Sequence, residues 1–246
     1  MNRPNRFVFG SMNIDKISGR SALELLRFVL EKGVRRFHTS FEYDSYDLFG
    51  TLMRQACSDM GVELNAIKYT VKLASPHFGE RSINSKEIIN RVDSYRSFLN
   101  VECIHQIQWM ARMDLQDENG RLELLDRELD VLHEVKTALT NASAIEQFGC
   151  FPYTVKFAKK ILESDVVDVM MDYLNENDSR PLEYAESLQR ASAQLLVLRP
   201  FDAGKTLTNE QSAVTIFKEL KTLSYLDGIA VGVSSIEHAE ELLEQE

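Results

Sequence analysis

Eight short apolar runs recur along the chain, and each is followed by a stretch with the spacing of an amphipathic helix. Most runs are rich in β-branched or aromatic residues and do not alternate cleanly with polar ones, which is typical of parallel strands covered on both faces. Eight strand–helix repeats predict a parallel sheet that closes into a (β/α)8 TIM barrel. The predicted strands are residues 6–10, 34–39, 67–73, 102–110, 144–149, 166–172, 194–198 and 228–233.

Helix signals between these strands support the same layout. Residues 21–30 carry apolar side chains at helical spacing and stop at Lys32-Gly33, a C-terminal signature, while Ser85 and Ser235 are predicted N-caps. An open doubly wound sheet would usually carry GxGxxG after its first strand, and this chain has Gly10-Ser11-Met12-Asn13 there. Because barrels commonly reach about 250 residues, we predict one domain over residues 1–246.

Composition excludes several classes of partner. The chain has 28 basic and 38 acidic residues, a formal charge of −10 that repels nucleic acid and anionic lipid. No apolar run is long enough to span a bilayer, and the first residues lack the apolar core of a signal peptide. The three cysteines are widely spaced, and no two potential metal ligands stand close together in the sequence. The sequence therefore predicts neither a disulfide framework nor a metal site. We therefore expect a cytoplasmic protein without a membrane or nucleic-acid partner.

Side chains fit for proton transfer stand at the ends of the second and third predicted strands. His38 and Tyr43 occur in Arg36-Phe37-His38-Thr39-Ser40-Phe41-Glu42-Tyr43, and Lys72 ends Tyr69-Thr70-Val71-Lys72. The carboxyl ends of barrel strands surround the active site in this fold, so these residues are the candidate catalytic groups. The longest irregular stretch, residues 111–120, is interpreted as a solvated loop.

The order of these motifs resembles the aldo-keto reductase family. The resemblance is carried by Phe9-Gly10-Ser11-Met12, by residues 37–43 with Leu48-Phe49-Gly50, by residues 69–73 and 199–204, and by Gly232-Val233-Ser234-Ser235. It covers nearly the whole chain in the right order. It implies a shortened barrel without the N-terminal hairpin usual in that family.

The resemblance also implies a chemistry. Those enzymes reduce carbonyls with NAD(P)H, using a Tyr acid beside a Lys that is paired with an Asp, and a His that orients the substrate oxygen. Tyr43 matches the acid and Lys72 its partner, while His38 stands at the Asp position and Met110, in Gln108-Trp109-Met110, at the His position. A neutral or cationic imidazole and a thioether cannot replace the original groups.

The positions that hold the cofactor in that family differ more. Gly149-Cys150-Phe151-Pro152 and Met170-Met171 replace the amide contacts, Leu198 replaces the stacking aromatic, and residues 237–242 are acidic where the family has Arg and Asn. We assign cofactor binding to Arg199, Gly232 and Ser234, the last two through backbone amides at a helix start. NADP or NAD is expected to bind weakly and without preference for the 2′-phosphate. Arg199 should pair with a carboxylate such as Asp172 or with an anionic ligand.

Aromatic residues near the strand ends predict a substrate pocket lined by Phe41, Trp109 and Met110. Three functions stay open. The first is a divergent NAD(P)H-linked carbonyl or alcohol oxidoreductase with Tyr43 as acid. The second is an enzyme of another class that uses His38, Tyr43 and Lys72 for acid-base or lyase chemistry without a cofactor. The third is a non-catalytic barrel that binds a protein partner or serves as a subunit of a complex.

Overall fold

The eight strands form one closed parallel barrel in the order β1 to β8, each paired with its neighbours in sequence and β8 with β1. This is seen in a computed structural model that describes residues 6–114, 117–208 and 212–244. The (β/α)8 prediction is confirmed, while the predictions on residues before the first strand concern positions 1–5, which lie outside the described residues. The strands are β1 Phe7–Gly10, β2 Arg36–Thr39, β3 Lys68–Ala74, β4 Ile104–Met110, β5 Ile145–Phe151, β6 Val169–Tyr173, β7 Gln194–Leu198 and β8 Leu226–Val231.

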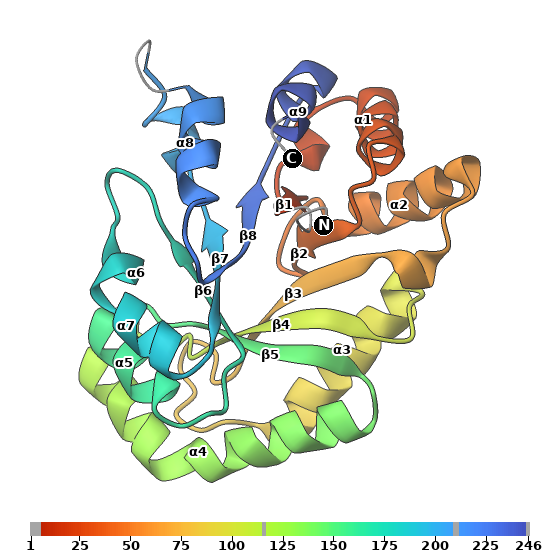
Figure 1. Cartoon of the computed structure of the whole chain (residues 1–246). Coiled ribbons are helices and arrows are strands. Elements are labelled where there is room, and N and C mark those ends of the chain that lie inside the picture. Colours follow the sequence, from red (N-terminus) through yellow and green to blue (C-terminus); the bar gives the residue numbers. More distant parts are fainter. Residues whose placement is uncertain (1–5, 115–116, 209–211, 245–246) are drawn as a thin grey trace.

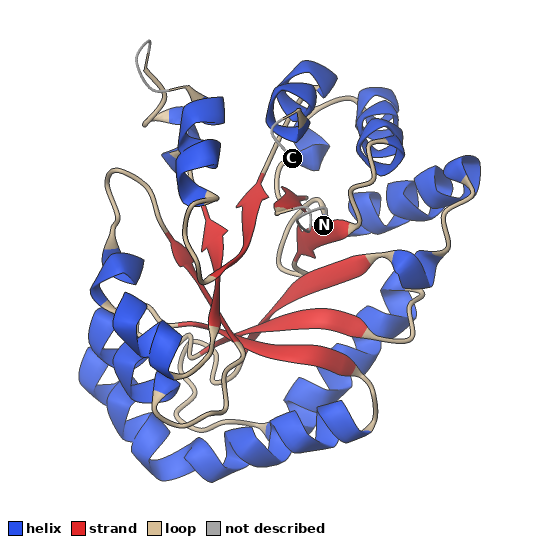
Figure 2. Ribbon diagram, in the orientation of Figure 1, coloured by secondary structure: helices blue, strands red, loops and turns tan. Residues whose placement is uncertain are grey.

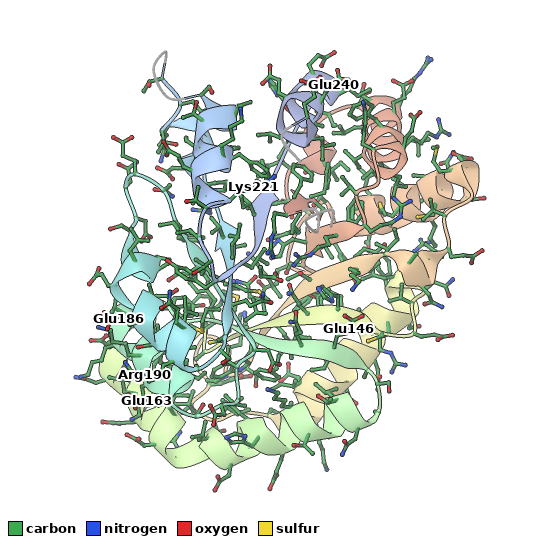
Figure 3. The ribbon with its side chains drawn as sticks, in the orientation of Figure 1. Glu146, Glu163, Glu186, Arg190, Lys221 and Glu240 are labelled. Carbon is green, nitrogen blue, oxygen red and sulfur yellow. The ribbon has the colours of Figure 1, made fainter. Side chains whose placement is uncertain are left out.

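Helices surround this barrel, as Figures 1 and 2 show. Exposed charged side chains such as Glu163, Glu186 and Arg190 lie on this outer layer (Figure 3). No helix within the described ranges is both long enough and apolar enough to cross a bilayer. The helices are α1 Gly19–Glu31, α2 Tyr46–Met60, α3 Ser85–Leu99, α4 Glu118–Asn141, α5 Val155–Leu162, α6 Arg180–Glu183, α7 Ala185–Arg190, α8 Ala213–Leu220 and α9 Ile236–Leu243, with short 3-10 turns η1 Ile14–Lys16, η2 Leu64–Ala66 and η3 Asp202–Gly204.

Most helix ends follow the sequence signals. Gly33 has φ +85° just after α1, and the Ser235 hydroxyl accepts the His238 N–H at the start of α9. The predicted cap at Ser85 is wrong, because Asn84 caps α3 by accepting the Glu87 N–H at 3.1 Å. The Asn84 amide oxygen reaches the third N–H of the helix, while Ser85 already lies in its first turn.

The barrel interior has an apolar upper layer, toward the carboxyl ends of the strands, and a polar lower layer, toward their amino ends. Small and apolar side chains from the strands fill the upper layer, among them Ala74, Met110, Phe151, Met171 and Leu198. Below them Arg36 pairs with Asp227, whose carboxylate also accepts a hydrogen bond from Gln106 at 3.0 Å. The Gln106 amide donates to Gln147 as well, at 2.7 Å. This buried polar network differs from the branched apolar filling usual in such barrels.

The last strand begins earlier than predicted. β8 runs from Leu226 to Val231, two residues before the predicted start at 228, and its pairing with β7 is irregular between Leu195 and Leu196. Asp227 lies in this early part, where its carbonyl accepts the Arg36 guanidinium at 2.8 Å. The ion pair with Arg36 therefore satisfies an aspartate that the pattern of apolar residues left outside the strand.

Candidate functional site

Tyr43 and Lys72 meet at the carboxyl ends of the strands. Lys72 projects into the barrel from β3, and Tyr43 lies in the loop between β2 and α2. The Lys72 Nζ lies 4.9 Å from the centre of the Tyr43 ring, within the range of a cation–π contact. Both side chains are half-buried, so the pair is reachable from the mouth of the barrel.

A tyrosine of α3 joins the two segments that carry this pair. The Tyr95 hydroxyl donates to the Lys72 carbonyl at 2.8 Å and accepts the Phe41 N–H at 3.0 Å. Because the second bond holds the loop that continues to Tyr43, one side chain fixes both partners relative to each other. Tyr95 is 2% exposed and lies against the rings of Phe41 and Tyr46.

Among the residues that the structure describes, Lys72 has no counter-ion at its ammonium group. In the described parts of the chain no carboxylate lies within 4.0 Å of its Nζ. The pKa of Lys72 is lowered from 10.5 to about 8, first by burial and then by the guanidinium groups of Arg112 and Arg199, while Glu42 acts in the opposite direction. At pH 7 Lys72 is therefore still mostly charged, with about a tenth of it in the neutral form.

Tyr43 is held in its protonated form. Burial raises the pKa of Tyr43 above the ordinary value of 10, and Tyr173, Tyr95 and Glu42 raise it further, whereas Arg199 lowers it. A phenol of this kind can donate a proton throughout the neutral range. It does not form a stable phenolate before reaction.

His38 is a neutral imidazole beneath the pair. Its side chain is 6% exposed, and its Nε2 lies 2.9 Å from the Gln108 amide oxygen, which assigns the Nε2 proton as the donor. Burial lowers the pKa of His38 to about 3, and the charge of Lys72 lowers it too. The ring centres of His38 and Tyr43 are 6.3 Å apart. His38 therefore places no charge beside Lys72 at neutral pH.

Arg112 belongs to the site although its segment was interpreted as a solvated loop. Its Nη1 lies 2.5 Å from the Glu42 carboxylate, which also lies 3.4 Å from His77 Nε2. Its Nη2 lies 4.0 Å from the Met110 sulfur. The interpretation of residues 111–120 was wrong at Arg112, and the signal that could have corrected it is that Arg112 follows the end of β4 by two residues. It was also wrong at residues 118–120, which already belong to α4, while residues 115–116 lie outside the described residues.

Arg199 does not pair with Asp172, so that part of the prediction was wrong, while the anionic ligand named as the other possible partner stays a prediction. Asp172 faces outward from β6, where its carboxylate lies 3.0 Å from Arg180 and accepts a hydrogen bond from the Tyr184 hydroxyl at 3.0 Å. Burial raises the pKa of Asp172 to about 6 against the opposing effect of Arg180. The Arg199 guanidinium is stacked on Tyr173, 4.8 Å from the ring centre, and its side chain is exposed at the mouth. Among the described residues it makes no ion pair.

The three residues predicted to line the substrate pocket lie in three different places. Met110 lies inside the barrel with Phe151 and Leu198. Trp109 is completely buried on the outside of the barrel, where it contacts Phe157 and donates to the Ser75 carbonyl at 2.7 Å. A pocket role for Trp109 is therefore wrong. Phe41 is 41% exposed and is stacked under Arg91, on the α3 side of the mouth, so it too does not line the interior.

The predicted cofactor positions at the end of β8 lie at the surface. Gly232 and Ser234 are exposed there, and a Cβ on Gly232 would lie in ordinary contact, 3.7 Å from the Gly10 carbonyl oxygen, so no side chain crowds the backbone. At the end where the family holds the nicotinamide carboxamide, the side chains of this chain do not match the family's amide contacts. Cys150 is fully buried outside the barrel, and Met171 packs in its apolar interior.

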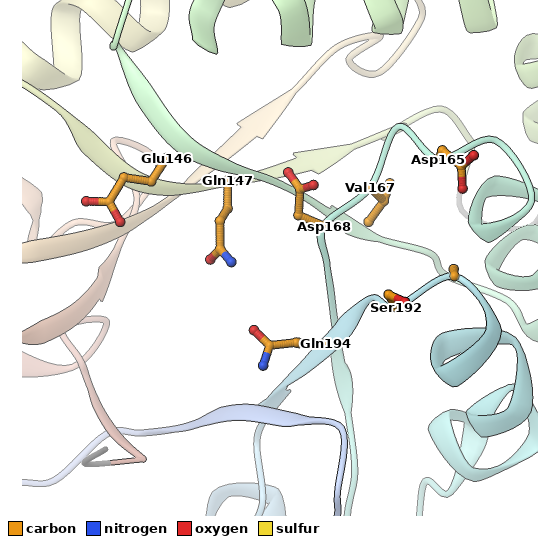
Figure 4. Close-up of a pocket in the computed structure, with 8 residues that line it drawn as sticks. Glu146, Gln147, Asp165, Val167, Asp168, Ser192 and Gln194 are labelled. Carbon is orange, nitrogen blue, oxygen red and sulfur yellow. The ribbon is translucent and has the colours of Figure 1, made fainter. Parts of the chain in front are cut away.

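Two hollows lie away from the mouth. One, of about 400 Å³, opens at the amino ends of β5 to β7, where Gln147 and Gln194 point into it (Figure 4). Its carboxylates Glu146 and Asp168 pair with Lys68 and Lys136, at 3.6 and 2.7 Å. Another, of about 360 Å³, lies between the loop after β6 and α8. Neither includes Tyr43 or Lys72.

Comparison with solved structures places this barrel among the aldo-keto reductase folds. The holo form of an aldo-keto reductase from Bacillus halodurans matches with a TM-score of 0.71 and 17% identity, over 98% of this chain and 86% of that one. A Pseudomonas aeruginosa protein assigned to the aldo-keto reductases has a TM-score of 0.72 and 17% identity, covering 98% and 89% of the two chains. A thermostable aldo-keto reductase in complex with the inhibitor epalrestat matches with a TM-score of 0.72 and 13% identity, over 98% of this chain and 89% of that one.

At these identities the likeness confirms the predicted resemblance as one of fold. No protein-family model and no curated protein matches the sequence.

Proposed function

We propose that the protein is a divergent NAD(P)H-linked carbonyl or alcohol oxidoreductase that acts at the mouth formed by Tyr43 and Lys72. The observation that carries this proposal is the 4.9 Å contact between the Lys72 ammonium and the Tyr43 ring, in a fold shared with aldo-keto reductases. A cofactor-free enzyme would use the same contact, and the fold shared with aldo-keto reductases is what favours the reductase over it, whereas a non-catalytic barrel gives the contact no role.

The residues of the mouth divide the work of a carbonyl reduction. Tyr43, protonated at neutral pH, donates its proton to the substrate oxygen as negative charge develops there. Lys72 in its charged form stabilises the phenolate that remains. Neutral His38 and Gln108 form the uncharged floor below them. A bound nicotinamide dinucleotide would supply the hydride, and Gly232, Ser234 and Arg199 are the groups that would hold its phosphates.

The test combines binding and turnover. Calorimetric titration with NADPH and NADH should give weak binding, with no preference for NADPH because the start of α9 is acidic. In a screen of aldehydes and ketones, Tyr43→Phe should cost about 10²- to 10⁴-fold in rate. Tyr225→Phe is the matched control, because its half-buried ring lies outside the mouth. Absence of binding at millimolar cofactor would contradict the proposal.

A further inference from the structure

Lys72 differs from an ordinary structural lysine in three respects. It projects inward at the mouth of the barrel, its side chain stays partly open to solvent, and no carboxylate of the described chain lies within 4.0 Å of its Nζ. A lysine that only packs usually extends its ammonium to water or to an acid. The Glu42 carboxylate, which could have neutralised Lys72, is engaged by Arg112 at 2.5 Å.

Such an environment raises the share of the free amine. Burial, followed by the guanidinium groups of Arg112 and Arg199, lowers the pKa of Lys72 to about 8, which leaves on the order of 10²-fold more neutral amine at pH 7 than an ordinary lysine has. Lysines desolvated beside another cation are the ones that attack carbonyl carbons in enzymes. His38, neutral at this pH, supplies no negative charge that would keep Lys72 protonated.

Arg199 supplies the second element of a binding site. Its side chain is exposed at the mouth, its guanidinium carbon lies 4.8 Å from the centre of the Tyr173 ring, and it makes no ion pair among the described residues. It is near enough to Lys72 and to Tyr43 to change the pKa of each. A planar guanidinium in this state is suited to a carboxylate, which it can bind with two parallel hydrogen bonds.

We propose that Lys72 forms an imine with the carbonyl carbon of an oxo acid, and that Arg199 holds the carboxylate of that acid. This inference goes beyond the proposed reduction: both bind a carbonyl compound at the mouth and use Tyr43 as proton donor, but here Arg199 holds the substrate carboxylate rather than a cofactor phosphate. It requires Lys72 to be neutral, whereas the reduction uses its charged form.

The step balances without an oxidant or a cofactor. The Lys72 nitrogen lone pair forms a bond to the carbonyl carbon, and the carbon–oxygen π electrons move to the oxygen, which takes a proton from Tyr43. The nitrogen loses a proton, which returns to the Tyr43 oxygen. The carbinolamine hydroxyl then leaves as water, taking one further proton from Tyr43, and the imine nitrogen gives up its second proton in return. The net reaction joins amine and carbonyl and releases one water.

Borohydride trapping tests the proposal directly. The full-length protein is incubated at pH 7 with pyruvate, a simple oxo acid, and treated with sodium borohydride in the absence of any nicotinamide. Reduction of the imine leaves a stable secondary amine, so the protein gains the mass of pyruvate less one oxygen atom. Peptide mapping of the natural sequence should place the adduct on Lys72, with about tenfold or more labelling relative to other lysines.

Matched variants define the specificity. Lys68→Arg removes an exposed lysine of the same strand, paired with Glu146, and should leave the labelling unchanged. Lys72→Arg should abolish it. Arg199→Gln should lower labelling by pyruvate about tenfold while labelling by acetone, which has no carboxylate, stays the same.

An adduct spread evenly over exposed lysines, or no adduct, would overturn the inference. Mapping in the natural sequence keeps this outcome decisive even where Lys72→Arg does not fold. The trap contains no cofactor, so its failure is separate from a failure of NADPH and NADH to bind, which would contradict only the proposed reduction.

Discussion

The Tyr95 hydroxyl donates to the backbone carbonyl of Lys72 at 2.8 Å, and this bond joins α3 to the strand that carries the candidate amine. The same oxygen accepts the Phe41 N–H, two residues before Tyr43. Tyr95 touches neither a reacting atom nor the ammonium group. It is a positioning residue, because it determines the separation of the two groups that the proposed chemistry needs.

Tyr95→Phe should therefore weaken activity more than stability. Loss of the hydroxyl leaves the Phe41 N–H unpaired and costs about 1 kcal/mol in the free energy of unfolding. Turnover at saturating substrate should fall about tenfold, because a small displacement between acid and substrate is costly. Steady-state kinetics well below the melting temperature measure this effect. An equal loss of kcat in Tyr225→Phe would indicate that the assay reports general destabilisation.

His38 predicts a stability that depends on pH. The pKa of His38 is lowered to about 3 in the folded protein, so between pH 6.5 and 3 the unfolded chain binds a proton that the folded chain does not. Stability therefore falls as pH falls through this window. Between pH 7 and pH 4.5, His38→Gln, whose amide can still donate to Gln108, should lose less unfolding free energy in urea than the natural protein does.

Asp172 contributes to the pH dependence of stability with the opposite sign. Its pKa is raised to about 6, so its folded form binds the extra proton and stability falls as pH rises from about 4 to 6. Because Asp172 is present in both proteins, the difference between them isolates His38. His238→Gln, an exposed histidine of α9, is the control. Identical pH profiles for His38→Gln and the natural protein would contradict the prediction.

The fold was predictable because the spacing of apolar residues and the order of the strand and helix signals can be read directly from the sequence. All eight strands overlap their predicted ranges, and Tyr43 and Lys72 were found from their positions at adjacent strand ends. The errors have a physical cause as well. Successive side chains of a strand point to opposite faces, so an inward Met110 requires an outward Trp109, and an inward Met171 requires an outward Asp172. Applying that alternation would have removed both incorrect assignments.

Contacts between distant segments could not be predicted in the same way. Glu42 and Arg112 lie on different loops, and only the closed barrel brings them to 2.5 Å. Arg180, the partner of Asp172, begins a helix of four residues that carries no clear periodic signal. The charge environment of Lys72 depends on these pairings, because Arg112 and Glu42 both act on its pKa. The residue types near one strand end therefore do not determine the charge environment of Lys72.

Removal of one partner of the ion pair inside the barrel is predicted to destabilise the fold strongly. Arg36 and Asp227 have side chains only 14% and 9% exposed, so removing one partner leaves a buried charge. Arg36→Met should lower the free energy of unfolding by about 3–5 kcal/mol. Arg20→Met removes the exposed pair with Glu24 and should cost about 1 kcal/mol or less. Chemical denaturation measures both, and equal losses would show that burial of the pair has no special effect.

Charge at the start of α9 should determine the preference between NADPH and NADH. Glu237 is fully exposed in the first turn of this helix, near the backbone of Gly232 and Ser234, and its carboxylate would repel a 2′-phosphate. Glu237→Arg should therefore tighten binding of NADPH about tenfold or more and leave NADH nearly unchanged.

Calorimetric titration of both cofactors measures the ratio of the two affinities. Glu163→Arg makes the same change of net charge on an exposed residue at the end of α5 and is the control for non-specific attraction. If Glu163→Arg strengthens NADPH binding as much as Glu237→Arg, the effect comes from net charge alone. If NADH tightens equally at Glu237→Arg, the phosphate that meets α9 belongs to the pyrophosphate, which both cofactors share, and the adenine ribose lies elsewhere.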